Sequence, residues 1–458
     1  MDAAGSDPIM SWRCRLSLSA YGWLMRLLVP VVLLKMFWRG RIEALYRHAI
    51  GERLGFYSAA VSAQVEPGRV WLHAVSLGET RAAAALLQTL REQQPDLRLL
   101  LTHGTATGRE AGRVLLRSGD LQVWMPWDSP GAVRRFFDTH RPSVGLLMET
   151  EVWPATLAAA ADRQLPMVLT NARLSAKSLR AQQAWPSLMR PAMRRFASVL
   201  AQTAADAQRL SDAGAGHVVI CGNLKFDMTP EPALLETGRA WRRALGRPVV
   251  MAASTREGEE APLLAAWQAA RQRAASSSAP FPLLLLVPRH PQRFDEVAES
   301  CRSAGLKLAR RSAWPSGQMP PPADADADVW LGDSLGELPL YYALADVALL
   351  GGSFAPLGGQ NLIEAAACAC PLLIGPSSFN FAEAADLAIA AGAAARVADL
   401  PAAVDAALRL LERESERALQ ADRARVFAAE HRGAAVRMTA AILALIADRP
   451  ATGQGLSD

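Results

Sequence analysis

Val70-Trp-Leu-His-Ala-Val-Ser-Leu-Gly-Glu-Thr80 is the stretch that decides the fold. Its first part, Val70–Val75, is an apolar run typical of a buried strand, and a helical pattern runs from Thr80 to Glu92. A buried strand that turns through a glycine into a helix is the repeating unit of α/β proteins. In a parallel sheet these turns gather at the carboxyl edge, where ligands bind. The stretch therefore predicts an α/β fold with functional residues just after the strands.

The same alternation repeats in two series, separated by a break at Met228–Pro232. The first series predicts strands at Val70–Val75, Leu97–Thr102, Leu121–Met125, Val144–Met148, Pro166–Thr170, Ser198–Ala201 and Val218–Cys221. The second predicts strands at Pro248–Ala252, Pro282–Val287, Val329–Leu331, Val347–Leu350 and Pro371–Ile374, with a loop at Ser312–Asp328 and a long helical tract at Ser415–Asp448. We expect an anchor over residues 1–50, a Rossmann-like domain over 51–230, and a second one with C-terminal helices over 231–458.

Composition narrows the class of protein. The chain has 458 residues, of which 51% are hydrophobic and 20% charged, so it can bury large cores and is not globally disordered. Most of the net charge of +5 lies in Met1–Arg53, which contains eight Lys or Arg residues and four acidic residues. The rest of the chain is nearly neutral and carries no basic stripe, which argues against nucleic acid. Five scattered cysteines without a CxxC pair favour neither a disulfide framework nor a zinc knuckle.

The basic end surrounds an apolar stretch, Leu16–Leu34, which has nearly the length of a membrane span but contains Arg26 and Pro30. Such a segment can span a bilayer or lie in its interface, with tryptophans such as Trp12 and Trp23 at headgroup depth. The alternative is a buried core helix. We expect an uncleaved membrane anchor that holds a soluble body against a membrane surface.

Three residues of the first half have the chemistry of an active site. Glu79 begins a helix after the first strand, so it is either a first-turn acid that the helix dipole stabilises or a general base. Glu149 follows the fourth strand and is either a cap or a second carboxylate facing Glu79. Lys225 is one of only four lysines in the chain, and is either a solvated side chain or one chosen for its compact ammonium.

The second half has features of a nucleotide site. Arg289 follows an apolar strand and suits a phosphate clamp. Gly336-Glu337-Leu338 starts a helix, and two glycine pairs, Gly351-Gly352 and Gly358-Gly359, flank a bend before a helix that bears Glu364. These loops are neither a GxGxxG motif nor a P-loop, and the seven histidines lack the spacing of metal ligands.

Taken in order, these motifs resemble the 3-deoxy-D-manno-octulosonic acid (Kdo) transferase family of lipopolysaccharide synthesis. The motifs that carry the resemblance are His73-Ala-Val-Ser-Leu-Gly-Glu-Thr80, Met148-Glu-Thr-Glu-Val-Trp-Pro154, Asn171-Ala-Arg-Leu-Ser175, Gly222-Asn-Leu-Lys-Phe-Asp227, Ser254-Thr-Arg-Glu-Gly-Glu-Glu260, Pro288-Arg-His290, Gly332-Asp-Ser-Leu-Gly-Glu-Leu338 and Gly358-Gly-Gln-Asn361. The resemblance implies a GT-B glycosyltransferase, with two doubly wound Rossmann-like domains facing a cleft and an N-terminal membrane-anchor helix. It also implies transfer of Kdo from CMP-Kdo to a lipid A precursor, without a metal or other cofactor, at the cytoplasmic face of the bacterial inner membrane.

The resemblance assigns roles to particular residues. The general base falls on Glu79, and the groups that stabilise the transition state fall on Glu149 and Lys225. The CMP contacts fall on Pro288, Arg289, Gly336, Glu337, Leu338, Asn361, Leu362, Ile363 and Glu364. This chain has Arg256 and Gln360 where the family often has histidine. Two other functions stay open: a sugar-nucleotide epimerase of the same architecture, and a non-catalytic membrane-bound protein that binds lipid or nucleotide.

Overall fold

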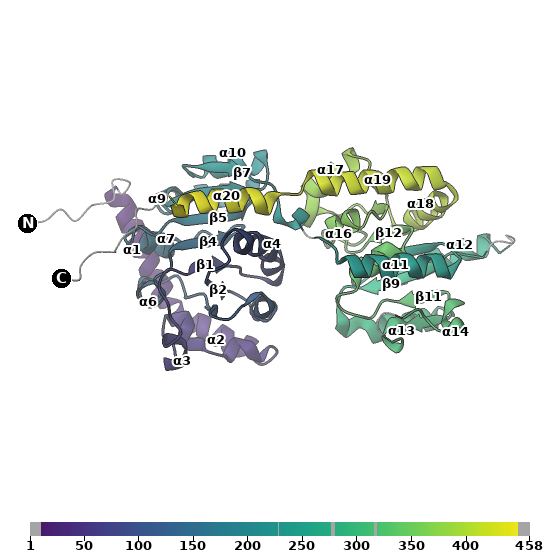
Figure 1. Cartoon of the computed structure of the whole chain (residues 1–458), viewed down its shortest axis with the longest axis horizontal. Coiled ribbons are helices and arrows are strands. Elements are labelled where there is room, and N and C mark those ends of the chain that lie inside the picture. Colours follow the sequence, from purple (N-terminus) through teal and green to yellow (C-terminus); the bar gives the residue numbers. More distant parts are fainter. Residues whose placement is uncertain (1–10, 228, 276–279, 316–317, 448–458) are drawn as a thin grey trace, which may run out of the picture. The chain divides into compact units, whose positions relative to one another are not determined.

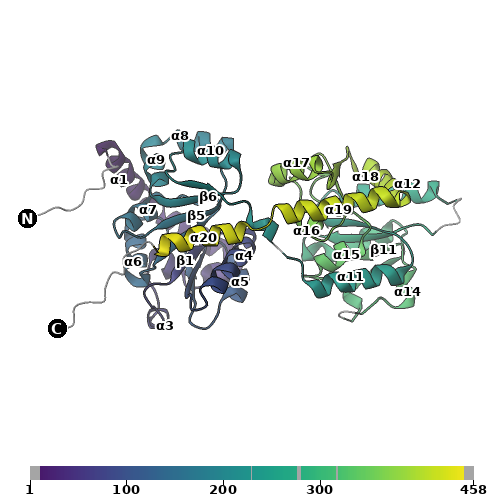
Figure 2. The same ribbon diagram turned by 45° about the horizontal axis from the view of Figure 1, so that its top comes forward.

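The computed structural model describes residues 11–227, 229–275, 280–315 and 318–447, which form two compact units (Figures 1 and 2). Unit 1 comprises residues 1–227 and 432–458, and unit 2 comprises residues 228–431. The second half of the chain is thus inserted into the first, because the C-terminal helix α20 (Ala434–Ala447) belongs to unit 1. The second domain expected over residues 231–458 is therefore wrong at its end, because α20 lies in unit 1.

Unit 1 contains a parallel sheet of seven strands in the order β3-β2-β1-β4-β5-β6-β7. Its strands are β1 Val70–His73, β2 Leu99–His103, β3 Leu121–Trp124, β4 Val144–Met148, β5 Met167–Ala172, β6 Phe196–Ala201 and β7 Val218–Ile220. Its helices are α1 Trp12–Leu27, α2 Val29–Arg39, α3 Ala59–Ser62, α4 Leu77–Gln93, α5 Ala106–Gly112, α6 Pro130–His140, α7 Pro154–Ala161, α8 Ala176–Gln183, α9 Pro186–Arg194, α10 Ala204–Asp212 and α20. All seven strands predicted from the sequence are confirmed, with ends shifted by a few residues.

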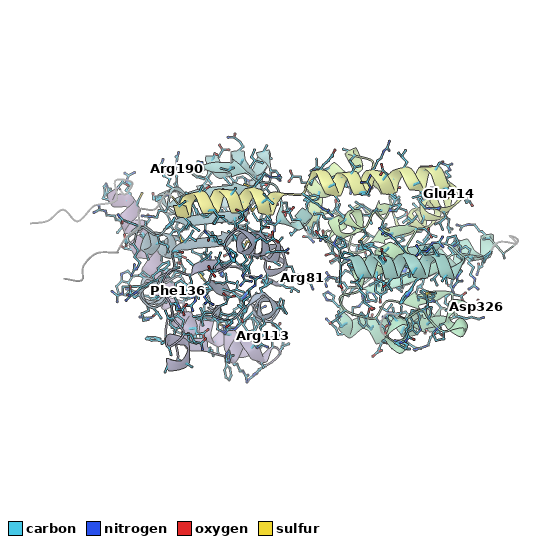
Figure 3. All side chains as sticks on the ribbon, viewed as in Figure 1. Arg81, Arg113, Phe136, Arg190, Asp326 and Glu414 are labelled. Carbon is cyan, nitrogen blue, oxygen red and sulfur yellow. The ribbon has the colours of Figure 1, made fainter. Side chains whose placement is uncertain are left out.

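Successive side chains of β1 point to opposite faces of the sheet and so build two cores. Trp71 packs on one face with Phe136 and Phe137 of α6, and Phe136, labelled in Figure 3, is fully buried. Val70 and Leu72 pack on the other face with α4 and α20. The sheet is therefore buried on both sides, which explains the unbroken apolar runs of its strands.

Unit 2 contains a second parallel sheet of seven strands in the order β10-β11-β9-β8-β12-β13-β14. Its strands are β8 Val249–Thr255, β9 Leu283–Pro288, β10 Leu308–Arg310, β11 Val329–Leu331, β12 Val347–Leu350, β13 Leu372–Ile374 and β14 Ala394–Arg396. Its helices are α11 Pro232–Leu245, α12 Glu260–Arg273, α13 Phe294–Ser303, α14 Pro322–Ala325, α15 Leu338–Leu344, α16 Leu362–Ala367, α17 Ala382–Ala390, α18 Leu400–Glu412 and α19 Glu414–Glu430. Two strands, β10 and β14, were not predicted, and each forms an edge of the sheet.

The expected anchor segment forms two helices rather than one, because the chain bends at Leu28, just before Pro30. Within the described residues no single helix is long and apolar enough to cross a membrane, whereas α1 and α2 together pass on length and composition with a bend of 44°. The pair is not a buried core element, since Gly22 is the only buried residue among its helical positions. Trp127 ties α1 to the body of unit 1, because its indole Nε1 donates to the carbonyl of Met25 at 2.8 Å.

Candidate active site

The strand order of each sheet reverses at one point, and such a switch point is where open α/β sheets bind ligands. In unit 1 it lies between β1 and β4, which pair with each other while β2 and β5 pair on their outer sides. In unit 2 it lies between β8 and β12. The segments that follow these four strands carry half of the residues that the sequence singled out, namely Glu79, Glu149, Asn361, Leu362, Ile363 and Glu364.

Glu79 occupies the first turn of α4, directly after β1. Ser76 is the N-cap: its Oγ accepts from the Glu79 N–H at 3.4 Å, and its hydroxyl donates to Glu79 Oε1 at 3.0 Å. The Val75 N–H donates to Glu79 Oε2 at 2.8 Å. This arrangement is similar to a capping box, except that the backbone donor to Glu79 belongs to Val75, one residue before the N-cap. Glu79 therefore has a structural role at the start of α4. The same bonds also fix the direction of the carboxylate, as a general base requires.

Burial raises the pKa of Glu79, and the neighbouring negative charge of Glu149 raises it further, while the Val75 N–H acts in the opposite direction. A carboxylate with a raised pKa is a stronger base than an exposed one, provided that it is ionised. Glu79 and Glu149 follow the neighbouring strands β1 and β4, so both lie at the switch point of this sheet.

Glu149 follows β4 with a backbone φ of +56°, in the left-handed region that few residues other than glycine adopt. Its N–H donates to the Thr170 carbonyl at 2.9 Å, which holds this conformation. The side chain of Glu149 is buried, and two cations contact its carboxylate. Arg173 Nε donates to Oε2 at 2.9 Å, and Lys225 Nζ lies 3.7 Å from Oε1. The structure therefore brings Glu149 and Lys225 together, and adds Arg173, to which the sequence analysis gave no role.

Lys225 is positioned by a loop that two amides hold. Asn171, at φ +51° in β5, accepts the Leu224 N–H on its side-chain oxygen at 3.0 Å. Asn223 accepts the Lys225 N–H at 3.0 Å and donates to Gln202 Oε1 at the same distance. These hydrogen bonds fix the backbone at Lys225, and its ammonium lies beside the buried Glu149.

Glu151 is the acidic residue that the sequence analysis quoted but did not assign. Burial raises its pKa to about 7, and the charges of Glu79 and Glu149 add to the rise. Three carboxylates therefore share one edge of the unit 1 sheet. A signal was present in the sequence, since Glu151 stands two residues after Glu149 in the same motif.

In unit 2 a group of cationic side chains follows β8 and β9. Arg289 is exposed, its N–H donates to the Thr255 carbonyl at 2.9 Å, and its Nε donates to Gln360 Oε1 at 3.2 Å. Burial lowers the pKa of His290, and the positive charges of Arg256 and Arg289 lower it further. Both positions at which the chain departs from the family pattern, Arg256 and Gln360, thus stand beside the predicted phosphate contact.

The glycine-containing loop after β12 is supported by Glu259, which is 1% exposed. Glu259 Oε2 accepts the N–H groups of Gly352 at 2.7 Å and Arg256 at 2.9 Å, and Oε1 accepts that of Phe354 at 3.0 Å. This carboxylate connects the loops after β8 and β12. Sequence reasoning quoted Glu259 within a motif but did not assign it this role.

Some of the other predicted CMP contacts have polar side chains that already bond within unit 2, and others have buried apolar side chains. Glu337 forms a salt bridge with Arg311 Nη2 at 2.6 Å. It lies between Gly336, which has a φ of +85°, and Leu338 at the start of α15.

Asn361 caps α16 by accepting the Ile363 N–H at 3.1 Å and donates to Glu364 Oε1 at 3.3 Å. The side chains of Leu362, Ile363 and Pro288 are buried, so a ligand would meet these residues through their backbone. The catalytic and CMP-binding roles of all these residues remain predictions.

Metal ligation was searched across the described part of the chain. No group of three or more His, Cys, Asp or Glu side chains there is arranged to hold a metal ion.

Comparison with known proteins adds independent information. The family model described as 3-deoxy-D-manno-octulosonic-acid transferase (kdotransferase) matches residues 48–228. The 3-deoxy-D-manno-octulosonic acid transferase of Bordetella pertussis is 52% identical over 374 residues, 80% of this chain and 85% of the relative. That of Haemophilus influenzae is 33% identical over 344 residues, 74% of this chain and 77% of the relative.

A solved structure, the UDP-GlcNAc 2-epimerase of Neisseria meningitidis, superposes with a TM-score of 0.54 over 82% of this chain and all of that one, at 16% identity. That likeness shows a GT-B-like α/β fold and nothing about activity, so the epimerase shares the architecture alone. The relatives, in contrast, are similar to this chain over most of their own length, across both units. Motif residues lie in the loops at both switch points, and the identity to these relatives extends over most of their length. The chain therefore belongs to the 3-deoxy-D-manno-octulosonic acid transferase family.

Proposed function

We propose that the protein transfers Kdo from CMP-Kdo to a lipid A precursor and that Glu79 is the general base. The observation that carries the proposal is the position of Glu79 at the unit 1 switch point, where burial and Glu149 raise its pKa. Membership of the Kdo transferase family supports Kdo as the sugar moved. The CMP leaving group and the lipid acceptor follow from the sequence resemblance.

In the proposed reaction an acceptor hydroxyl attacks the anomeric carbon of Kdo. The new C–O bond forms as the bond to the CMP phosphate oxygen breaks, the electron pair of that bond leaves with CMP, and the hydroxyl proton passes to Glu79. Val75 and Ser76 hold the Glu79 carboxylate for this transfer. Lys225, beside Glu149, supplies positive charge that offsets the negative charge developing in the transition state.

The donor is assigned to unit 2, whose strand ends carry positive charge. Arg289 and Arg256 suit the phosphate of CMP, because guanidinium groups bind phosphate through charge-assisted hydrogen bonds. Glu364, which accepts from Asn361, is the acceptor proposed for the ribose hydroxyls. Glu259 supports this site by holding the Gly352 loop rather than by touching the ligand.

Attachment to the cytoplasmic face of the bacterial inner membrane is also proposed. Its support is the outer surface of α1 and α2, where Trp23, Leu27, Leu34 and Trp38 are each more than 60% exposed. Arg26 and Arg41 lie over the rings of Trp23 and Trp38, which places cations next to the apolar surface as interfacial helices do. Flotation of the full chain with anionic and neutral vesicles tests this attachment.

The decisive experiment incubates the purified full chain with CMP-Kdo and a tetra-acylated lipid A precursor, and measures product masses and CMP release. We expect a mass increase of one or more Kdo units, CMP release that depends on the acceptor, and an unchanged rate in EDTA. Absence of Kdo-bearing product would refute the function. A rate that EDTA abolishes and Mg²⁺ or Mn²⁺ restores would refute metal independence alone, whereas an altered donor sugar without acceptor would favour the epimerase.

A further inference from the structure

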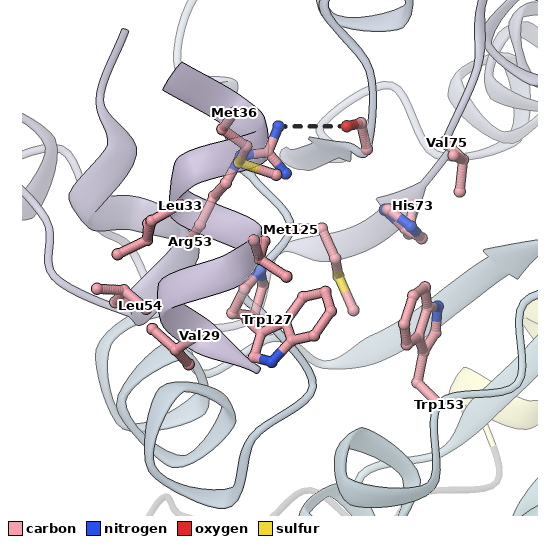
Figure 4. A pocket seen from close by; sticks show the side chains of 13 residues that line it. Val29, Leu33, Met36, Arg53, Leu54, His73, Val75, Met125, Trp127 and Trp153 are labelled. Carbon is pink, nitrogen blue, oxygen red and sulfur yellow. Dashed lines mark hydrogen bonds between the residues drawn. The ribbon is translucent and has the colours of Figure 1, made fainter. Parts of the chain in front are cut away.

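A cavity of about 240 Å³ lies in unit 1 between α2 and the loops that follow the strands (Figure 4). The wall from α2 consists of Val29, Val32, Leu33 and Met36. The spacing of these residues, i, i+3, i+4 and i+7, places them on one face of the helix. On the other side of the same helix Val31 and Leu34 are 59% and 63% exposed. The helix thus presents one apolar face to the cavity and another outward.

The opposite wall adjoins the carboxylate site. Val75 lines the cavity, and its N–H is the donor that holds Glu79 Oε2. Trp153, two residues after Glu151, lines it as well. Figure 4 shows Val75, His73 and Trp153 on the side away from α2. A molecule in this cavity would therefore lie next to the proposed general base.

One imidazole nitrogen in the wall lacks a partner. His73 is 0% exposed, and its Nδ1 lies 2.9 Å from Thr102 Oγ1. Its Nε2 is buried without a hydrogen-bond partner among the residues that the structure describes. Burial lowers the pKa of His73 to about 3, so the ring is neutral at physiological pH. A hydroxyl group can bond to Nε2 in either tautomer, because it both donates and accepts.

Arg53, another polar side chain of the wall, already donates one hydrogen bond. Arg53 Nη2 donates to the Gly104 carbonyl at 3.2 Å, the dashed line in Figure 4. Its guanidinium carbon lies 4.0 Å from the centroid of the Trp124 ring. Arg53 Nε and Trp153 Nε1 of the wall are also buried without a hydrogen-bond partner among the described residues, but each of them can only donate. His73 Nε2 is the nitrogen that can either donate or accept, so it suits a hydroxyl group on the occupant.

We propose that this cavity holds one acyl chain of the lipid acceptor, and that a hydroxyl group on that chain bonds to His73 Nε2. The inference rests on the proposed function, since it places the lipid tail beside the base that activates the sugar. A cavity of about 150 Å³ takes up benzene, so about 240 Å³ accommodates roughly eight to ten carbon atoms of a chain. Val75 both lines the cavity and donates to Glu79, so the cavity adjoins the proposed base. This position favours a chain of the acceptor over a chain of a bulk membrane phospholipid.

The first test fills the cavity from α2. Leu33→Trp points a larger side chain inward, and Leu34→Trp is the matched control on the exposed side. Calorimetry without donor should show at least a tenfold loss of affinity for the acylated precursor in Leu33→Trp and no change in Leu34→Trp. CMP affinity and circular dichroism should be unchanged in both. Equal precursor affinity in a folded Leu33→Trp protein would overturn the proposal.

The second test concerns His73 and uses two precursors that differ only in the hydroxyl groups of their acyl chains. The parent protein should prefer the hydroxylated precursor, and His73→Phe should lose that preference while still binding both. An unchanged preference would overturn the hydrogen bond. Equally tight competition by a phospholipid with plain chains of matched length would overturn the choice of occupant.

These outcomes are separable from the proposed function. If the parent protein makes no Kdo-bearing product, the function fails. If it makes the product and Leu33→Trp binds the precursor as the parent does, only the cavity assignment fails.

Discussion

Glu79 and Glu259 occupy corresponding places in the two units, since each follows the first strand of its sheet at the beginning of the next helix. Glu259 is fully buried and accepts three backbone N–H groups, so it links two loops. Glu79 accepts one backbone N–H and one hydroxyl, and it lies beside Glu149 and Glu151. Glu259 thus serves as a structural brace between two loops, whereas fewer donors surround Glu79, as its proposed role of general base requires.

The largest effect is expected for Glu79→Gln. Glutamine keeps the size of the side chain and can still accept from the Val75 N–H, so the start of α4 and the free energy of unfolding should change little. It cannot take a proton, so turnover should fall by about 10² to 10⁴. Kdo transfer assays and thermal melts measure the two effects.

The parent rate should also rise with pH as Glu79 ionises, and the raised pKa moves this rise above the usual range of a glutamate. A folded Glu79→Gln protein with near-normal transfer would mean that Glu79 is only a capping acid, and Glu149 would be tested next.

The strand ends of unit 2 carry cations, whereas those of unit 1 carry carboxylates. Arg289→Ala tests whether these cations bind the phosphate of CMP. Losing one charge-assisted phosphate contact should weaken CMP binding by about 10- to 100-fold, or roughly 1.5–3 kcal/mol. Arg302→Ala, which removes an exposed arginine paired with Glu299 in the same unit, is the control. Calorimetry that gives the same CMP affinity for Arg289→Ala and Arg302→Ala would contradict the assignment.

Glu259→Gln applies to unit 2 the substitution that is expected to lower turnover most in unit 1. The amide nitrogen of glutamine cannot accept a hydrogen bond, so at least one of the three N–H donors loses its partner. An unsatisfied buried donor costs about 1–3 kcal/mol, and we expect a loss of stability of that size. Chemical denaturation followed by fluorescence measures it. If stability is unaffected and only the rate falls, the distinction between brace and base fails.

The smallest effect concerns Glu151 and depends on pH. Its pKa is about 7 in the folded protein and near 4.5 when exposed, so the folded state binds the proton more tightly. The free energy of unfolding therefore falls as pH rises from about 4.5 to 7. Glu151→Gln removes this dependence and should melt above the parent at pH 8, with a smaller difference at pH 5. A gain of about 1 kcal/mol corresponds to roughly 2–4 °C. A difference that is equal at both pH values would show that the charge is not the cause.

Long apolar strands were predictable because burial on both faces leaves a continuous signal, as in Leu283–Val287. The edge strands β10 and β14 were not, since each is three residues long and ends in an arginine. The predicted helix Ser415–Asp448 is interrupted between His431 and Gly433, where Gly433 has a φ of +89°; residues from 448 on lie outside the described ones. Gly433 itself was the available signal.

Within the candidate site, strand-end position identified Glu79, Glu149 and Arg289 from the sequence. It could not distinguish Glu151 or Glu259, because the number of hydrogen-bond donors around a carboxylate depends on segments far apart in the chain. Phe354 and Glu259, for example, are 95 residues apart. The pairing of Arg289 with Gln360 has the same long-range origin.

The return of α20 to unit 1 has a consequence for synthesis on the ribosome. Both oxygens of Asp227 accept N–H groups at the start of α20, from Gly433 and Ala435, and Met438 and Ile442 fill the core against α4. All of unit 2 is translated between these partners. Residues 228–431 can therefore fold while the earlier part of the chain still exposes an apolar groove, and the unit made first is the one completed last. A chain released with its end just before Gly433 should therefore show a protease-sensitive unit 1 and a protected unit 2.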